Sequence, residues 1–255
     1  MDGKHILIQA PKLSGSQFYN YKGTFSTILL AAADANYCFI FVDVGEYGSS
    51  HDGTVFAKSS LGRGLEDGCL DLPCPPPDGL QYVFLGDEAF PLKANLLRPY
   101  PGRNMSNVNR HKRQVFNYRL SRARRVVENT FGILVTKWRI FRQPIIGAVE
   151  TVDVIVKAAT VLHNFLRRRD GTSTESLPYI GPDEVDAEHD GQIRRGAWRA
   201  QAESAGALQC PGRLGSNNAA REVMGLRDRF ADYFASPEGS VPWQDRVVRR
   251  GELDT

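Results

Sequence analysis

A short apolar segment that ends in a glycine and an acid most constrains the fold of this chain. The segment runs from Tyr82 to Leu85, and Gly86 and Asp87 follow it. Buried parallel strands are continuous apolar runs, and open α/β sheets carry functional groups at the carboxyl ends of such strands. The sequence therefore predicts an α/β fold in which Asp87 follows a central strand.

The residues before this strand predict an antiparallel part of the same sheet. Residues 5–9 are typical of a short strand. Two runs rich in apolar and β-branched residues, 24–33 and 37–44, are separated by a tight polar turn, as in a β-hairpin. A short helix is expected at about 51–60, and a loop rich in glycine, proline and acids at 61–79. A mixed sheet flanked by helices follows from this order.

Two longer helices are expected after the strand. The first covers about 113–134, where apolar residues recur every three or four positions, and the second covers about 150–169. Between the strand and the first helix, residues 98–109 are expected to form a mobile basic loop. From 171 to 216 no periodic apolar stripe occurs, and 218–234 reads as one isolated helix. We therefore expect a domain at 1–169 and a largely disordered acidic tail at 170–255.

Charge is strongly segregated along the chain. Residues 98–169 contain sixteen basic and three acidic side chains, although the net charge of the whole chain is only +3. Such a block is typical of a surface that binds nucleic acid, while a solvated helix face is the simpler alternative. The residues expected to contact a DNA backbone are Arg110, Lys112, Arg113, Arg119, Arg122, Arg125, Lys137 and Arg142.

Acids on separate elements are candidates for a metal site. Asp87 after the strand, Glu128 at the buried edge of the basic helix and Asp2 at the first strand would offer carboxylates to Mg²⁺, and two such ions can promote phosphodiester hydrolysis. Each acid has a simpler interpretation. Asp87 would cap a turn, Glu128 would pair with a neighbouring arginine, and Asp2 would lie in a frayed end. For Asp52, helix capping is favoured over metal binding.

Several short motifs, taken together and in order, resemble the DDE nuclease domain of Harbinger (PIF) transposases and their domesticated relatives. The resemblance covers about residues 2–168. It rests on 2–5 (DGKH), 20–23 (NYKG), 48–52 (GSSHD), 86–90 (GDEAF), 116–124 (FNYRLSRAR), 127–132 (VENTFG) and 162–165 (LHNF).

The resemblance implies a ribonuclease H-like fold and a nuclear DNA endonuclease that depends on Mg²⁺ or Mn²⁺. The acid triad of the family would fall on Asp2, Asp87 and Glu128, whereas Asp52 matches a recurrent position outside the triad. A separate Myb-like protein would supply sequence-specific DNA binding.

The amino end departs from the family pattern. Only Met1 precedes Asp2, where family members usually have a helical region, so the nuclease domain is expected to be truncated at its N-terminus. A truncated or domesticated protein that binds DNA or a partner without cleavage is therefore the alternative function, and a metal-dependent RNA nuclease is a weaker one. No apolar run is long enough for a membrane helix, and four cysteines without metal-ligand spacing favour a reduced, intracellular protein.

Overall fold

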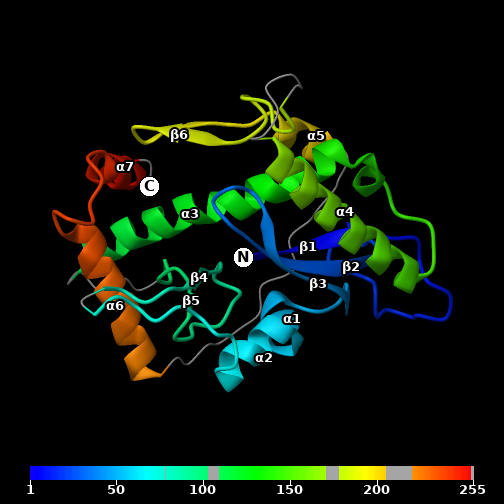
Figure 1. Cartoon of the computed structure of the whole chain (residues 1–255), viewed down its shortest axis with the longest axis horizontal. Helices are drawn as coiled ribbons and strands as arrows, with labels where there is room; N and C mark the ends of the chain where they lie inside the picture. Colours follow the sequence, from blue (N-terminus) through cyan, green and yellow to red (C-terminus); the bar gives the residue numbers. More distant parts are fainter. Residues whose placement is uncertain (78, 103–108, 171–177, 205–219, 254–255) are drawn as a thin grey trace.

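Three antiparallel strands form the first part of the fold. The computed structural model describes residues 1–77, 79–102, 109–170, 178–204 and 220–253. Within it, β1 (Asp2–Leu7), β2 (Ser26–Ala33) and β3 (Phe39–Tyr47) lie in the order β1-β2-β3 (Figure 1). Asp2 lies opposite Ala31, and Thr27 lies opposite Tyr47. The hairpin predicted from the sequence is confirmed, and Tyr37 in its turn has a positive φ of 61°.

A short parallel pair forms a separate two-stranded sheet beside the start of β1. Strands β4 (Phe84–Leu85) and β5 (Leu96–Leu97) pair in parallel, and the backbone nitrogen of Met1 donates a hydrogen bond to the carbonyl of Leu85 at 2.6 Å. The predicted strand before Asp87 is therefore present, although it is shorter than expected. Its parallel partner β5 was not predicted, because two leucines alone give no periodic signal.

The helices predicted before residue 170 are confirmed, and one more is present in this part of the chain. They are α1 (Asp52–Lys58), α2 (Ser60–Asp67), α3 (Arg110–Lys137) and α4 (Val149–Arg169), with a 3₁₀ turn η1 (Arg139–Arg142) after α3. Helix α2 lies where a loop was expected. Its glycines argue against a helix, but the Ser59 hydroxyl accepts a hydrogen bond from the Gly62 nitrogen, and Gly68 ends the helix with a φ of 66°.

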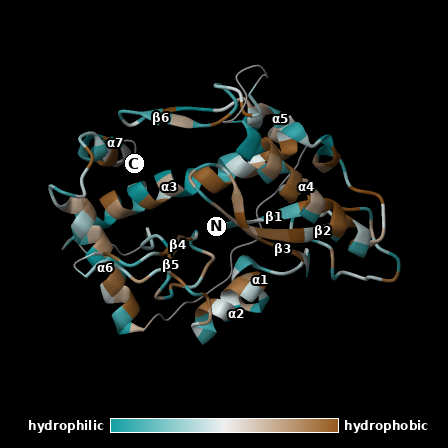
Figure 2. Cartoon of the chain, viewed as in Figure 1, coloured by the Kyte–Doolittle hydropathy of each residue, from teal (hydrophilic) through white to brown (hydrophobic). Residues whose placement is uncertain are grey.

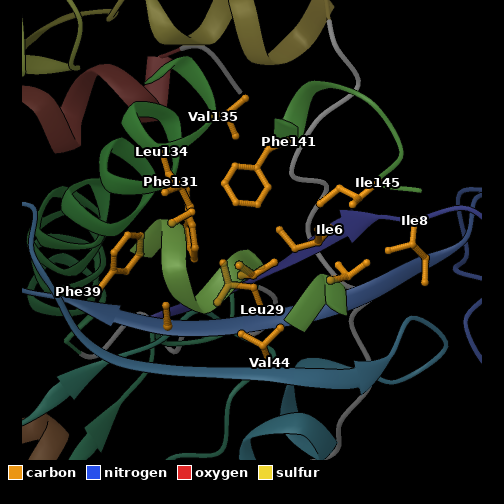
Figure 3. Packing of buried hydrophobic residues seen from close by; sticks show 14 of the residues in the cluster. Ile6, Ile8, Leu29, Phe39, Val44, Phe131, Leu134, Val135, Phe141 and Ile145 are labelled. Atoms are coloured by element: carbon orange, nitrogen blue, oxygen red, sulfur yellow. The ribbon is translucent and has the colours of Figure 1, made fainter. Parts of the chain in front are cut away.

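Both faces of the sheet are covered, so β2 is buried on both sides. Alternate residues of β2 point in opposite directions. Leu29 and Ala31 join the core formed with α3, α4 and residues around Phe141, and Figure 3 shows Phe131 and Leu134 of α3 lining the same core. Ile28 and Leu30 pack with α1 and α2 on the other face. The hydropathy colours of Figure 2 are accordingly apolar along most of β2 and β3.

The described residues after 170 are folded, which differs from the expected disordered tail. They form the hairpin β6 (Ala187–His189) and β7 (Gln192–Arg194), and the helices α5 (Trp198–Ser204), α6 (Arg221–Ala235) and α7 (Gln244–Leu253). The predicted helix at 218–234 is confirmed as α6, but it is not isolated.

Helix α6 belongs to a third core, which explains the difference. Phe230 and Ala231 pack with Phe116 and Leu120 of α3, residues more than a hundred positions away. Partners at such a separation leave no local pattern. Residues 103–108 of the predicted loop and residues 171–177, 205–219 and 254–255 of the predicted tail lie outside the described residues. No helix of the described part of the chain is both long and apolar enough to cross a membrane.

Candidate metal centre and the basic face of α3

Three aspartates from different elements converge at the amino end of β1. Asp2 lies on β1, Asp52 is the first residue of α1, and Asp87 follows β4. One carboxylate oxygen from each lies within 4.8 Å of those of the other two. Residues far apart in the sequence thus present three oxygen ligands to one point.

The sheet holds Asp2 and Asp87 in place. Asp2 is buried within β1 rather than at a frayed end, and its Oδ1 accepts a hydrogen bond from the Gly3 nitrogen at 3.1 Å. The Oδ1 of Asp87 accepts a hydrogen bond from the Ala89 nitrogen at 2.8 Å, so the predicted turn interaction is present. A hydrogen bond to one carboxylate oxygen leaves the other available, and turn capping and metal binding are therefore compatible for Asp87.

Asp52 lies in the least favourable position for a charge. It is buried, and its Oδ1 has no hydrogen-bond partner among the described residues. Burial, together with the negative charges of Asp2 and Asp87, raises the pKa of Asp52 to about 8. Asp52 lies in the first turn of α1, after the N-cap residue His51, as the favoured helix-terminal role requires. That position alone does not give its buried Oδ1 a hydrogen-bond partner. A cation placed among the three acids would remove the repulsion between them.

Two basic side chains lie beside Asp2. The Lys4 ammonium is 3.0 Å from Oδ2 of Asp2, and one Arg124 nitrogen is 3.7 Å from its Oδ1. Burial alone would raise the pKa of Asp2, but the charges of Lys4 and Arg124 lower it below its usual value. At neutral pH Asp2 is therefore ionised, whereas Asp52 is protonated.

Glu128 lies outside this group of acids. The same Arg124 nitrogen that approaches Asp2 is 3.9 Å from Glu128, and Arg199 of α5 is 3.7 Å from the other Glu128 oxygen. The predicted pairing of Glu128 with a neighbouring arginine is therefore observed. Among the described residues the structure groups Asp52, and not Glu128, with Asp2 and Asp87. The motif at 48–52 was the sequence signal that could have identified Asp52.

The cluster fits a hard divalent cation. Its ligand atoms are all carboxylate oxygens, the donors preferred by Mg²⁺ and Mn²⁺, and it contains neither histidine nor cysteine. The orphaned Oδ1 of Asp52 supplies a buried acceptor with nothing to accept from. The donor set and the electrostatic strain both indicate a site for such an ion.

The basic residues of α3 and η1 are largely engaged by the segment after residue 170, which runs along α3 (Figure 1). Arg125 is 2.7 Å and Arg122 is 3.6 Å from the Glu188 carboxylate in β6. Ion pairs of 2.7 Å also join Lys112 to Asp232 of α6 and Lys137 to Glu184. Four of the eight predicted DNA contacts thus have acidic partners within the chain.

The other four predicted contacts have different surroundings. Arg119 donates to the Gly239 carbonyl at 2.8 Å and stacks on Phe234, whereas the Arg113 guanidinium lies over the Tyr100 ring. Arg142 donates to the Thr136 carbonyl at 2.7 Å. Arg110 is exposed at the start of α3. Except for Arg110, these side chains make contacts that stabilise the fold, a role that the sequence pattern did not distinguish from phosphate binding.

Comparison with known proteins agrees with the geometry. The family described as DDE superfamily endonuclease matches residues 1–164, which include all three converging aspartates. The protein named "Protein ALP1-like" of Arabidopsis thaliana is 25% identical over 220 residues, covering 82% of this chain and 51% of that protein. The chain therefore spans about half the length of this relative. No solved structure matches the chain.

Proposed function

Because the chain belongs to the DDE superfamily endonucleases, as its resemblance to Harbinger transposases predicted, we propose that it is a metal-dependent nuclease that hydrolyses DNA phosphodiester bonds. The convergence of Asp2, Asp52 and Asp87 is the observation that carries this proposal. Asp52 is buried beside two other acids with its Oδ1 unpaired, and a bound cation would stabilise this arrangement.

A ribonuclease H-like arrangement of the sheet is part of the proposal. The pairing β3-β2-β1 is antiparallel, β4 meets the start of β1 through Met1 and Leu85, and β5 pairs in parallel with β4. The three-stranded sheet β1-β2-β3 and the separate pair β4-β5, which meets the start of β1 through this one hydrogen bond, support this topology. It also explains the site, because the start of β1 and the end of the adjacent β4 lie at the same edge.

Mg²⁺ or Mn²⁺ is the proposed cofactor, held by Asp2, Asp52 and Asp87. When bound, such ions supply Lewis-acid activation of a phosphate oxygen and of the attacking water. The chain itself contributes a rigid β1, which fixes Asp2, and a buried environment that favours ion binding over exposed carboxylates. Arg124 lies between Asp2 and Glu128, so Glu128 would approach the site only if Arg124 moved toward a bound phosphate.

The proposal extends to DNA as the substrate, to a Myb-like partner and to a nuclear location. The positive charge of residues 98–169 supports a polyanionic ligand. Arg110, exposed at the N-terminal end of α3, is the best placed of the predicted backbone contacts, because the others already have partners within the chain. The Myb-like partner and the nuclear location rest on the family resemblance alone.

A non-catalytic protein that binds DNA or a partner is the second candidate. The observation that favours it is the close approach of Lys4 and Arg124 to Asp2, since these cations already neutralise part of the site. In this version the acids would stabilise the fold around two basic side chains, and no ion would be required.

A nicking assay on supercoiled and hairpin DNA with Mg²⁺ or Mn²⁺ tests the proposal. We expect the intact chain to cut, and the variants Asp87→Asn and Asp52→Asn to cut on the order of 100-fold more slowly. Asp71→Asn, which changes an exposed loop acid, is the matched control and should cut like the parent. Slower cutting by the variant Glu128→Gln would show that this side chain takes part in cleavage, and cutting like the parent would show that it does not.

Each other outcome has a defined meaning. Equal cutting by the parent and both aspartate variants would remove the cluster from the mechanism. Binding of DNA that weakens with salt, without cutting by the intact chain, would favour the non-catalytic candidate. Equal cutting of an RNA duplex would extend the substrate to RNA.

A further inference from the structure

Helix α4 carries an apolar stripe on its outer surface. Val154, Val161, Leu162 and Phe165 are between 45% and 66% exposed, and Ala158 lies exposed between them. Their spacing places all five on one side of a helix. We name these five residues the outer stripe of α4. Contiguous apolar surface of this kind marks a contact with another molecule more often than scattered exposed residues do.

The outer stripe cannot turn inward, because the opposite side of α4 is fixed in the core. Val152, Val156 and Ala159 pack against the sheet. The Asn164 side chain exchanges two hydrogen bonds of 2.8 Å with the backbone of Phe39 in β3. In Figure 1, α4 lies over the strands on the side of the molecule away from α6 and α7, and Figure 2 shows apolar colour along it. The stripe is therefore permanently presented to solvent or to a partner.

The charges at the two ends of α4 identify the partner. Glu150 is exposed in the first turn, and Arg168 and Arg169 are exposed in the last turn. Two copies of α4 in antiparallel contact would place Glu150 of each beside the arginines of the other. The same register sets Val154 opposite Phe165 and Ala158 opposite Val161. From this self-complementarity we propose that the outer stripe of α4 is the contact of a symmetric homodimer.

The alternatives fit these charges less well. A parallel pair of helices would bring the arginine runs of two chains together, which opposes association. An antiparallel two-fold pair is isologous, so that each favourable contact occurs twice. Ala158 near the centre allows close approach of the two helices. A 21-residue helix is only about 32 Å long, so the interface is small and the dimer is weak, with a micromolar dissociation constant.

Sedimentation of the DNA-free chain over about 1 to 200 μM tests the dimer. The average mass should rise from 28.4 kDa toward twice that value. Val161→Asp should weaken association at least about tenfold, because it buries a charge in the stripe. Ile193→Asp on β7 is the matched control, since Ile193 is 57% exposed and lies outside α4, and it should associate like the parent. A monomeric parent, or unchanged association of Val161→Asp, would overturn the proposal.

A charge exchange tests the antiparallel register without replacing a residue of the stripe; among the exchanged residues, Arg169 contacts it, because its guanidinium lies over the Phe165 ring. Glu150→Arg should weaken association several-fold, and the further changes Arg168→Glu and Arg169→Glu should restore it. Thermal unfolding of each variant verifies that the fold is retained. Failure of the triple variant to recover would exclude the antiparallel pairing. The result does not depend on the proposed nuclease function, because no residue of the metal centre is changed.

Discussion

The carboxylate cluster and the basic face of α3 are two concentrations of charge that the fold treats in opposite ways. In the cluster, three acids converge, and one of them, Asp52, is held protonated by its surroundings. On the basic face, which consists of Lys112, Arg122, Arg125 and Lys137, each cation has an acid of the C-terminal segment beside it. Only in the carboxylate cluster do like-charged groups remain close together without enough opposite charge beside them.

The pKa values of two buried acids shift in opposite directions and illustrate the contrast between the two regions. Burial raises the pKa of Asp52 to about 8, and the nearby acids add to the rise. Burial also acts on Glu188, whose side chain is 2% exposed, but hydrogen bonds from Tyr118 and Arg125 outweigh it and lower the pKa of Glu188. A buried charge that is hydrogen-bonded and ion-paired within the chain, such as Glu188, contributes to the stability of the fold. A buried acid beside like charges is a candidate ligand for a cation.

The largest expected effect concerns Asp52 and pH. In the metal-free protein, folded Asp52 binds a proton up to about pH 8, whereas the ordinary pKa of an aspartate, which applies in the unfolded chain, is 3.8. Between these values the folded state holds more protons, so stability falls as pH rises. The contribution is at most about 1.4 kcal/mol per pH unit, or about 4 kcal/mol from about pH 5 to about pH 8.

Urea unfolding in EDTA measures this effect. The variant Asp52→Asn should lose less stability than the parent as pH rises. The difference in the free energy of unfolding between the variant and the parent should therefore grow toward pH 8. Addition of Mn²⁺ should stabilise the parent and not the variant, because a ligand that binds only the folded state shifts the equilibrium toward it. If the free energy of unfolding of both proteins changed with pH in the same way, Asp52 would not be destabilised by its neighbours. The contrast with the basic face would then disappear.

The next effect concerns Glu188, the acid that pairs with two of the four cations of the basic face. Glu188→Ala should destabilise the protein by about 3 kcal/mol, because it leaves Arg122 and Arg125 without their buried partner. Asp183→Ala is the control. Asp183 pairs with Arg194 but is 82% exposed, so its loss should cost less than about 1 kcal/mol. Equal losses in urea unfolding would mean that the C-terminal segment is not held by this acid.

The sequence predicted the parts of the fold that have local patterns. The helix at 113–134, the helix at 150–169 and the hairpin of β2 and β3 all have regular apolar spacing, and the structure contains them. Helix α2 was missed because Gly62 and Gly64 lower its propensity, whereas a serine cap and packing against the sheet compensate. Local rules fail where tertiary contacts decide the outcome.

The candidate site was predictable in part for the same reason. Asp87 was identified from the strand before it, and Asp2 from the family motif. Asp52 was assigned to helix capping, because its approach to the other two aspartates depends on how α1 packs under the sheet. The basic face was assigned to DNA because charge composition does not show that Glu184, Glu188 and Asp232 fold back onto α3.

The smallest expected effect, on DNA binding, tests whether pairing with the C-terminal segment masks the basic face. Asp232→Asn removes the acid 2.7 Å from Lys112, and both side chains are largely exposed, so stability should change by less than about 0.5 kcal/mol. The freed Lys112 should strengthen non-specific DNA binding about two- to threefold at low salt and steepen the salt dependence by about one counterion. Fluorescence anisotropy against a salt series measures both quantities, with Asp183→Asn as the control, because Asp183 lies outside the pairs of α3. Unchanged binding would mean that DNA does not contact this end of α3, and the proposed DNA surface would then have to lie nearer to the aspartate cluster.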